Sequence, residues 1–307
     1  MTYLHLLLAS SLLIPSTRVD PQFDDDEIVK KALEKAGRQL EADWFRIPTS
    51  WEDAWVYQSK KHQVRTMHSF WLAKTVAKSL DDMTQHFEAF LGLKAVSGRR
   101  LPVEIHPDLA AYQNVGGSVQ NDRTAHHSSA HGAFWTNELD GEPVITYELS
   151  PISLVKRFAT HAAFHRHLHA CNANNFPEWL EEALCAYFEM YWDTTEDRST
   201  PHFRSLVKRG ELRSWVELTQ LTADQFGPNE RVQLAMMVHF LQNVCESTRQ
   251  VENKEGVLSP GPFQEYVQAR ARRAADQPLD EGLQEIGAWM ADPVLEEEYR
   301  ALGEPAD

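Results

Sequence analysis

The stretch Thr160-His161-Ala162-Ala163-Phe164-His165, followed by Pro177-Glu-Trp-Leu-Glu-Glu-Ala-Leu-Cys-Ala-Tyr-Phe-Glu189, decides how this chain is interpreted. His161 and His165 are four residues apart, a spacing that places two side chains on one face of a helix with roughly 5 to 6 Å between their Cβ atoms. Both imidazoles can therefore reach one cation. Zinc in a catalytic site takes three protein ligands from histidine, cysteine or carboxylate. The sequence predicts that His161, His165 and Glu182 form such a zinc site.

Start and stop signals delimit the two helices that carry these residues. Ser150 and Pro151 supply an N-cap and a proline at the first helical position, and residues 172–175 end the pattern. A second helix opens at Pro177. The 17 residues from the second histidine to the glutamate leave room for the end of one helix, a loop and the start of the next.

The first helix places both imidazoles on a stripe that faces a core, made of Leu154, Phe158, His161, His165 and Leu168. A polar group without a partner is costly there, and a bound metal would remove the cost. Two other interpretations stay open: both histidines can be core residues bonded to backbone carbonyls or to Glu182, and His169 can be the third zinc ligand. No glycine bends the helix back near His169, so Glu182 is preferred.

A helical pattern over residues 27–92 precedes a small predicted sheet. Residues 102–106 alternate like a strand, and residues 131–136 and 143–148 are predicted to form a hairpin, because Asp140-Gly141 favours a tight connection. Beyond Thr200 the chain is predicted to be helical. The expected fold class is α+β, and the expected parts are a signal peptide at 1–20, a helical N-terminal extension at 21–100, the sheet and zinc-site helices at 101–195, and a helical C-terminal subdomain at 196–307.

Composition restricts the classes of partner. The chain of 307 residues carries 30 basic and 45 acidic residues, a formal net charge of -15, which would repel phosphate backbones and anionic lipid. We therefore expect no nucleic-acid partner. The three cysteines, Cys171, Cys185 and Cys245, are too few for a disulfide framework and match no zinc-ribbon spacing, so they are predicted to be ordinary small buried side chains.

The first 14 residues form an apolar stretch that is too short to span a bilayer but has the length of a signal-peptide core. This favours a secreted or periplasmic protein. Against it, no lysine or arginine precedes the stretch and His5 interrupts it. An ordinary N-terminal helix of a cytoplasmic protein is the alternative, and no integral membrane segment is expected.

The segment Trp179-Leu-Glu-Glu-Ala-Leu-Cys-Ala-Tyr-Phe-Glu189 resembles the second helix of the gluzincin metallopeptidases, the peptidase MA group, in which a W-L-x-E-G-x-A-x-Y-x-E segment supplies the third zinc ligand. Glu182 falls on that glutamate. The resemblance covers roughly residues 101–245 and is closest to the peptidase MA-like and uncharacterised bacterial gluzincins. It implies a gluzincin-like domain in which strands precede an H-E-x-x-H helix and further helices follow.

The chain departs from the family pattern at Ala162, which stands where H-E-x-x-H has its glutamate. That glutamate is the general base, a role worth roughly 10²- to 10⁴-fold in rate. The sequence has no tyrosine between Tyr191 and Tyr266 to stabilise an oxyanion, although Arg231 or His239 could serve. Both a natural loss of catalysis and an engineered Glu-to-Ala change in an active peptidase explain the alanine.

The resemblance and the departure together predict a zinc-binding, metallopeptidase-like protein that is catalytically impaired. Binding of a peptide or protein is expected to persist, because an extended peptide can add to a strand through backbone hydrogen bonds alone. The predicted binding strand consists of Gly132, Ala133, Phe134 and Trp135. A metal-free structural or interaction protein is the alternative.

Overall fold

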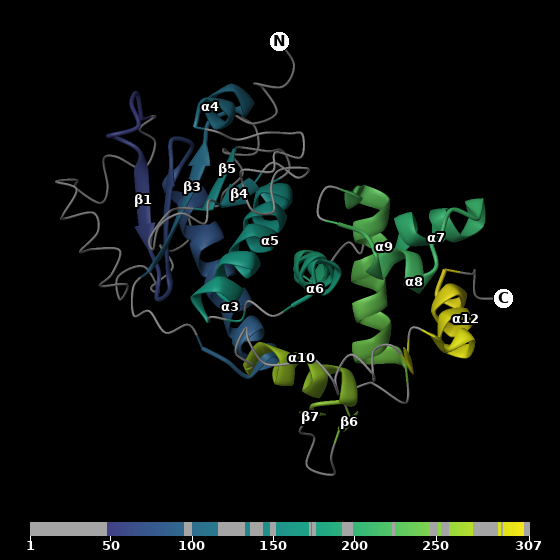
Figure 1. Cartoon of the computed structure of the whole chain (residues 1–307). Helices are drawn as coiled ribbons and strands as arrows, with labels where there is room; N and C mark the ends of the chain where they lie inside the picture. Colours follow the sequence, from purple (N-terminus) through teal and green to yellow (C-terminus); the bar gives the residue numbers. More distant parts are fainter. Residues whose placement is uncertain are drawn as a thin grey trace, which may run out of the picture. The chain divides into compact units, whose positions relative to one another are not determined.

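A five-stranded sheet with helices packed on it forms the centre of the computed structural model (Figure 1). The structure describes residues 48–94, 100–115, 133–135, 144–147, 152–171, 173, 176–191, 199–222, 225–245, 251–252, 258–272, 288–289 and 291–303. All of them belong to one unit, Phe45–Asp307. The predicted signal peptide, Gly132 and the N-cap at Ser150 lie outside the described residues.

The strands follow the order β1 (Trp55–Gln58), β2 (His62–Thr66), β3 (Leu101–His106), β5 (Val144–Tyr147) and β4 (Ala133–Trp135). The two inner pairings, β2 with β3 and β3 with β5, are parallel. The two outer pairings, β1 with β2 and β4 with β5, are antiparallel. The predicted strand at 102–106 and the predicted hairpin are therefore confirmed, and β4 is an edge strand among the described residues.

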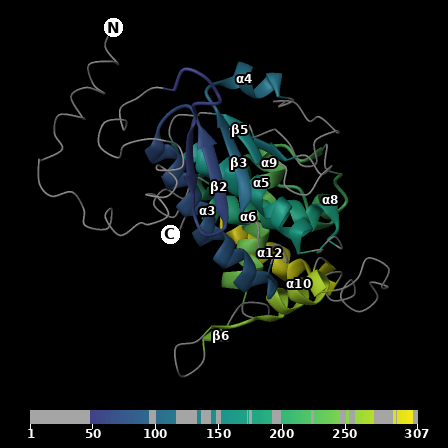
Figure 2. The same cartoon turned by 90° about the vertical axis from the view of Figure 1, so that its left-hand side faces the viewer.

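Two helices, α3 (Phe70–Leu91) and α5 (Ile152–Ala170), pack on the sheet, and in Figure 2 the strands lie in front of them. The Ser69 hydroxyl caps α3 by accepting from the backbone of Leu72, and Gly92 ends it in the left-handed region at φ 63. Helix α6 (Glu178–Tyr191) packs on α5, and α9 (Pro228–His239) packs on α6. Both helices predicted to carry the zinc site are confirmed.

The remaining elements are short. They are α4 (Leu109–Asn114), α7 (Ser199–Arg209), α8 (Trp215–Thr219), the π-helical turn η3 (Phe240–Val244), β6 (Val251–Glu252), β7 (Leu258–Ser259), α10 (Pro262–Arg272) and α12 (Pro293–Ala301). None of the described helices combines the length and the apolar character that a membrane-spanning helix needs.

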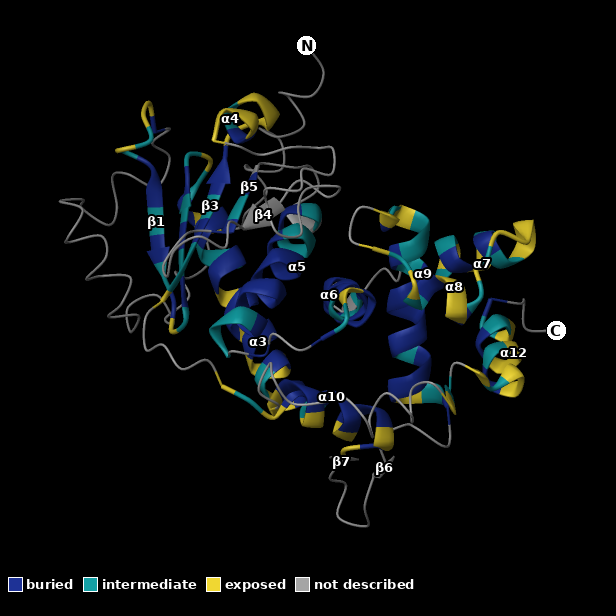
Figure 3. Cartoon of the chain, viewed as in Figure 1, coloured by how far each residue is buried: buried dark blue, intermediate teal, exposed yellow. Residues whose placement is uncertain are grey.

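A cluster of three phenylalanine rings holds the helices of the candidate site together. Phe87 of α3 meets Phe164 of α5 edge-on at 4.7 Å between ring centroids, and Phe188 of α6 stacks on Phe164 at 4.9 Å. All three rings are buried, and α5 and α6 are largely dark blue in Figure 3. Because Phe164 precedes His165 and Phe188 precedes Glu189, this packing fixes the two site helices against each other.

Two parts of the predicted secondary structure are wrong. Residues 55–66, included in the helical pattern over 27–92, form β1 and β2. Their side chains alternate between buried and half-buried, the period of a strand, and β2 gains two strand partners that a helix would lack. Beyond Thr200 the two-residue strands β6 and β7 interrupt the predicted run of helices. The α+β class itself is confirmed.

A buried ionic cluster ties β2 to α3 and makes stability depend on pH. The Asp81 carboxylate lies 2.9 Å from His62 Nδ1 and accepts from the Ser59 hydroxyl at 2.8 Å. Burial lowers the pKa of His62, and the bond to Asp81 only partly opposes it. Burial raises the pKa of Asp81, but bonds from His62 and Ser59 outweigh burial and lower it. The pKa of each side chain is therefore lower in the folded protein than in the unfolded chain, so protonation of either group favours unfolding.

We therefore expect the free energy of unfolding to fall as the pH decreases from about 6.5, the usual pKa of histidine, and to fall further as Asp81 becomes protonated. In the His62→Gln variant, the decline that begins near pH 6.5 should be less steep. The slope should be smaller by the contribution of one proton, which is up to about 1.4 kcal/mol per pH unit. Urea denaturation at a series of pH values measures this, with His86→Gln on the exposed side of α3 as the control. Identical slopes in the wild type and His62→Gln would contradict the assignment.

Candidate metal centre

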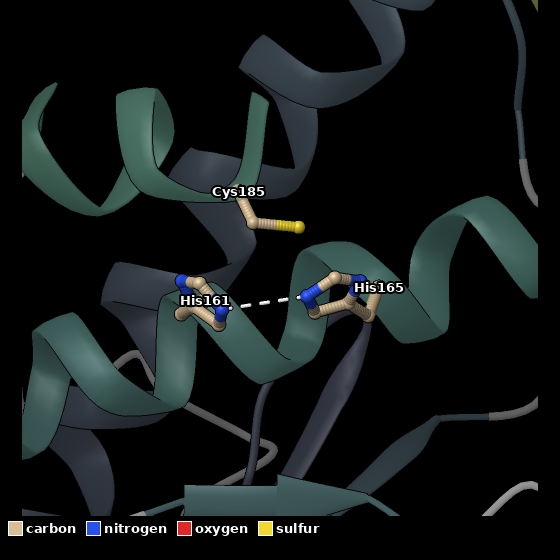
Figure 4. Close-up of side chains that lie close together, drawn as sticks. All are labelled: His161, His165 and Cys185. Carbon is tan, nitrogen blue, oxygen red and sulfur yellow. Dashed lines mark hydrogen bonds between the residues drawn. The ribbon is translucent and has the colours of Figure 1, made fainter. Parts of the chain in front are cut away.

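His161 and His165 lie one turn apart on α5, and both side chains are buried between α5 and α6. Their Nε2 atoms are 3.3 Å apart, the contact drawn as a dashed line in Figure 4. The same figure shows the sulfur of Cys185, on the facing helix, next to the two rings. Two imidazole nitrogens at this distance are in place to share one cation.

The opposite nitrogen of each ring lies against a carboxylate of α6. His165 Nδ1 is 2.7 Å from Glu181 Oε1, and His161 Nδ1 is 3.1 Å from Glu189 Oε2. A histidine that binds a metal nearly always gives its second N–H to a carboxylate, a carbonyl or water, which fixes the ring and its tautomer. The contact of His165 with Glu181 is a hydrogen bond, whereas the contact of His161 with Glu189 meets only the distance of an ion pair. With a proton on Nδ1 of both rings, the lone pairs of the two Nε2 atoms would face each other, and a cation between them would stabilise this arrangement.

The carboxylate of Glu182 faces the Nε2 atoms of both histidines. Its Oε1 is 3.5 Å from His161 Nε2 and its Oε2 is 3.6 Å from His165 Nε2. Two nitrogen or oxygen ligands of a tetrahedral zinc ion, each about 2.0 to 2.1 Å from the metal, are about 3.4 Å from each other. The structure therefore brings together the three side chains that the sequence selected, with a different oxygen of Glu182 facing each histidine. The group of possible metal ligands found among the described residues holds Cys185 in place of Glu182.

Arg231 and Arg157 hold the carboxylates in place. Arg231, on α9, donates from Nε to Glu182 Oε1 at 2.5 Å, and Arg157, on α5, donates from Nη2 to Glu189 Oε1 at 3.0 Å. The Arg231 Nη1 atom is buried and has no hydrogen-bond partner among the described residues. The Arg231 guanidinium keeps the buried Glu182 carboxylate ionised, as a metal ligand must be.

Cys185 belongs to the same group. The ligand atoms of His161, His165 and Cys185 all lie within 4.8 Å of one another, and the three side chains are buried, so this group could hold a metal ion. The sequence predicts Cys185 to be an ordinary buried side chain, and its position beside the histidines was not predicted. The spacing could have predicted it, because Cys185 follows Glu182 by three residues and so lies on the same face of the second helix.

The ionisable groups of the centre shift one another's pKa values. Burial lowers the pKa of His165, but hydrogen bonds to Cys185 and to the two neighbouring glutamates outweigh burial and hold the pKa well above its usual value. Burial raises the pKa of Glu182, but the Arg231 guanidinium and the histidines hold it well below its usual value. Burial raises the pKa of the Cys185 thiol to about 12. The centre thus favours a positive charge beside an ionised Glu182.

The other residues selected from the sequence occupy different places. Ala162 is buried on α5 and brings no ionisable group to the centre. His169 does not belong to the group of possible ligands found among the described residues. His239 lies with its Nδ1 3.3 Å from Asn243 Nδ2, and Arg231 is bound to Glu182. Residues 133–135 form the edge strand β4.

No protein-family model matches the chain, and no curated protein matches it significantly.

The carboxylates behind the histidines give a direct test of the centre. Glu189→Gln and Glu181→Gln are each expected to weaken metal binding about 10- to 100-fold, because each removes the charge that orients and polarises an imidazole. Competition for Zn²⁺ against a chromophoric chelator measures the affinity. Glu178→Gln is the matched control, since Glu178 is exposed on the first turn of the same helix. Equal affinities in all four proteins would show that these carboxylates do not support a metal.

Proposed function

We propose that this protein is a zinc-binding, metallopeptidase-like protein that binds peptides and has lost efficient hydrolysis. One observation carries the proposal: two imidazole Nε2 atoms 3.3 Å apart, each with a carboxylate at its Nδ1, beside the carboxylate of Glu182. Zinc is favoured over other cations because histidine nitrogen and carboxylate oxygen in a tetrahedral arrangement suit it. The resemblance of the second helix to that of the gluzincins supports the same assignment.

The missing general base limits what the centre can do. A bound zinc ion would lower the pKa of a water ligand to near 7. Hydrolysis of a peptide also needs a group that takes the proton from the water and passes it to the leaving amine. The methyl group of Ala162 can do neither. Each charged group in contact with the centre already has a partner: Glu181 and Glu189 lie against the imidazoles, and Glu182 lies against Arg231.

The edge strand β4 is the proposed peptide site. It pairs with β5 on one side only among the described residues, and it packs against α5, the helix of both histidines. An extended peptide can pair with the other side of such a strand through main-chain hydrogen bonds, without catalysis. Ala133, Phe134 and Trp135 form this strand.

The experiment is a proline scan of β4 in the full chain. Proline removes a backbone donor, and in an edge strand alternate donors point away from the sheet. Among Ala133→Pro, Phe134→Pro and Trp135→Pro, at least one variant should keep the wild-type melting temperature and lose more than about tenfold in retention of tryptic casein peptides by the immobilised protein. Val56→Pro in the opposite edge strand is the control. The peptide part of the proposal fails if every folded β4 variant retains peptides like the wild type.

A metal-free interaction protein is the second candidate, and one observation favours it. Arg231 is bound to Glu182, and the raised pKa of His165 allows a proton to occupy the space between the imidazoles. In that state Glu182 and the two Nε2 atoms are satisfied without a metal. Metal analysis separates the two candidates.

A further inference from the structure

Cys185 occupies a position in the centre that the proposed function does not use. It lies on α6 one turn after Glu182, buried, and its sulfur lies next to the two imidazoles in Figure 4. The gluzincin segment that this helix resembles has alanine at the corresponding position, so the thiol is a feature of this chain. Cys171 and Cys245 are the other two cysteines of the sequence, and neither belongs to the group of possible metal ligands.

The distances allow one ion to contact both histidines and Cys185. The Cys185 Sγ and the two histidine nitrogens lie within 4.8 Å of one another. In a tetrahedral zinc site with a Zn–S distance of about 2.3 Å, sulfur and nitrogen ligands are about 3.6 Å apart. A shift of about 1 Å in the thiol, within reach of one side-chain rotation, would bring the sulfur to that distance.

We propose that the Cys185 thiolate is the fourth protein ligand of the metal, beside His161, His165 and Glu182. The inference rests on the proposed function, since it adds a ligand to the same ion. As the metal–sulfur bond forms, the thiol gives its proton to solvent; a thiol that coordinates zinc is deprotonated even where burial otherwise keeps it protonated. Four protein ligands leave no position for water, which is the arrangement of structural zinc sites. The centre then holds α5 and α6 together instead of activating water.

Cobalt(II) titration of the full chain tests the inference, because a cobalt–thiolate bond gives a charge-transfer band in the near-ultraviolet and tetrahedral coordination gives strong visible bands. The wild type should bind one Co²⁺ with both features. Cys185→Ala should still bind one Co²⁺ and lose the charge-transfer band. Cys185→Ser serves the same purpose if the alanine variant does not fold.

The controls are Cys171→Ala and Cys245→Ala, which should keep the band. Cys171 is the more informative control, because its Sγ lies 3.5 Å from His167 Nε2. This cysteine–histidine pair could bind cobalt independently of the centre. One Co²⁺ bound without a thiolate band would overturn the role of Cys185 and leave the three-ligand site standing. No bound Co²⁺ at all would overturn both the inference and the proposed metal site.

Discussion

Replacement of Glu182 by glutamine is expected to weaken zinc binding by more than about 100-fold. Glu182 lies within 3.6 Å of both imidazole Nε2 atoms, and in the described part of the chain no other carboxylate is recorded in contact with both of them. Loss of a group behind the ligands typically costs 10- to 100-fold in metal affinity, and loss of a ligand itself should cost more. Chelator competition at constant pH measures the change.

Glu182→Gln also leaves Arg231 buried without its carboxylate, a loss of the kind that costs about 3 to 5 kcal/mol. The double variant Glu182→Gln/Arg231→Gln removes both charges and separates metal affinity from stability. Arg231→Gln alone is the matched control, and it should retain zinc more tightly than the double variant. If the double variant binds zinc as tightly as Arg231→Gln, Glu182 is not a ligand.

The second large effect is a gain of activity. The double variant Ala162→Glu/Cys185→Ala should hydrolyse casein peptides about 10² to 10⁴ times faster than Cys185→Ala, because it combines a general base with an open metal position. Ala162→Glu alone should stay nearly inactive, since Cys185 still fills the fourth position.

Release of peptide fragments, followed by mass spectrometry, measures this result, with zinc content and melting temperature recorded for each variant. Removal of zinc by a chelator should abolish the gain. Full activity of Ala162→Glu alone would show that the base was the single missing part and that Cys185 does not close the centre. An inactive but zinc-loaded double variant would show that oxyanion support is lost as well.

Local patterns in the sequence were enough to predict the helices and strands closest to the candidate site. The spacing of His161 and His165, the two strands of the hairpin and the start of the second helix at Pro177 each depend on neighbouring residues, and the corresponding elements are present. The predicted Asp140-Gly141 connection lies outside the described residues. The helix at Phe70–Leu91 was included in the helical pattern for the same reason. Such signals are carried by a period of 3.6 or 2 residues and need no knowledge of tertiary contacts.

Contacts between distant segments could not be predicted in this way. The helical pattern was extended over β1 and β2, whose stability comes from pairing with each other and with β3, about 40 residues away in the chain for β2. The carboxylates at the Nδ1 atoms, Glu181 and Glu189, depend on how α6 lies against α5. That orientation is set by the phenylalanine cluster, which the sequence pattern did not identify.

The central claim is that side chains from α5 and α6 bind one divalent metal ion. Metal analysis of the purified full chain, together with zinc titration of the metal-free protein, tests it most directly. We predict one zinc ion per chain in the wild type and none in a His161→Gln/His165→Gln variant that remains folded. Absence of stoichiometric zinc in the wild type, or equal zinc binding by the folded double variant, would contradict the account.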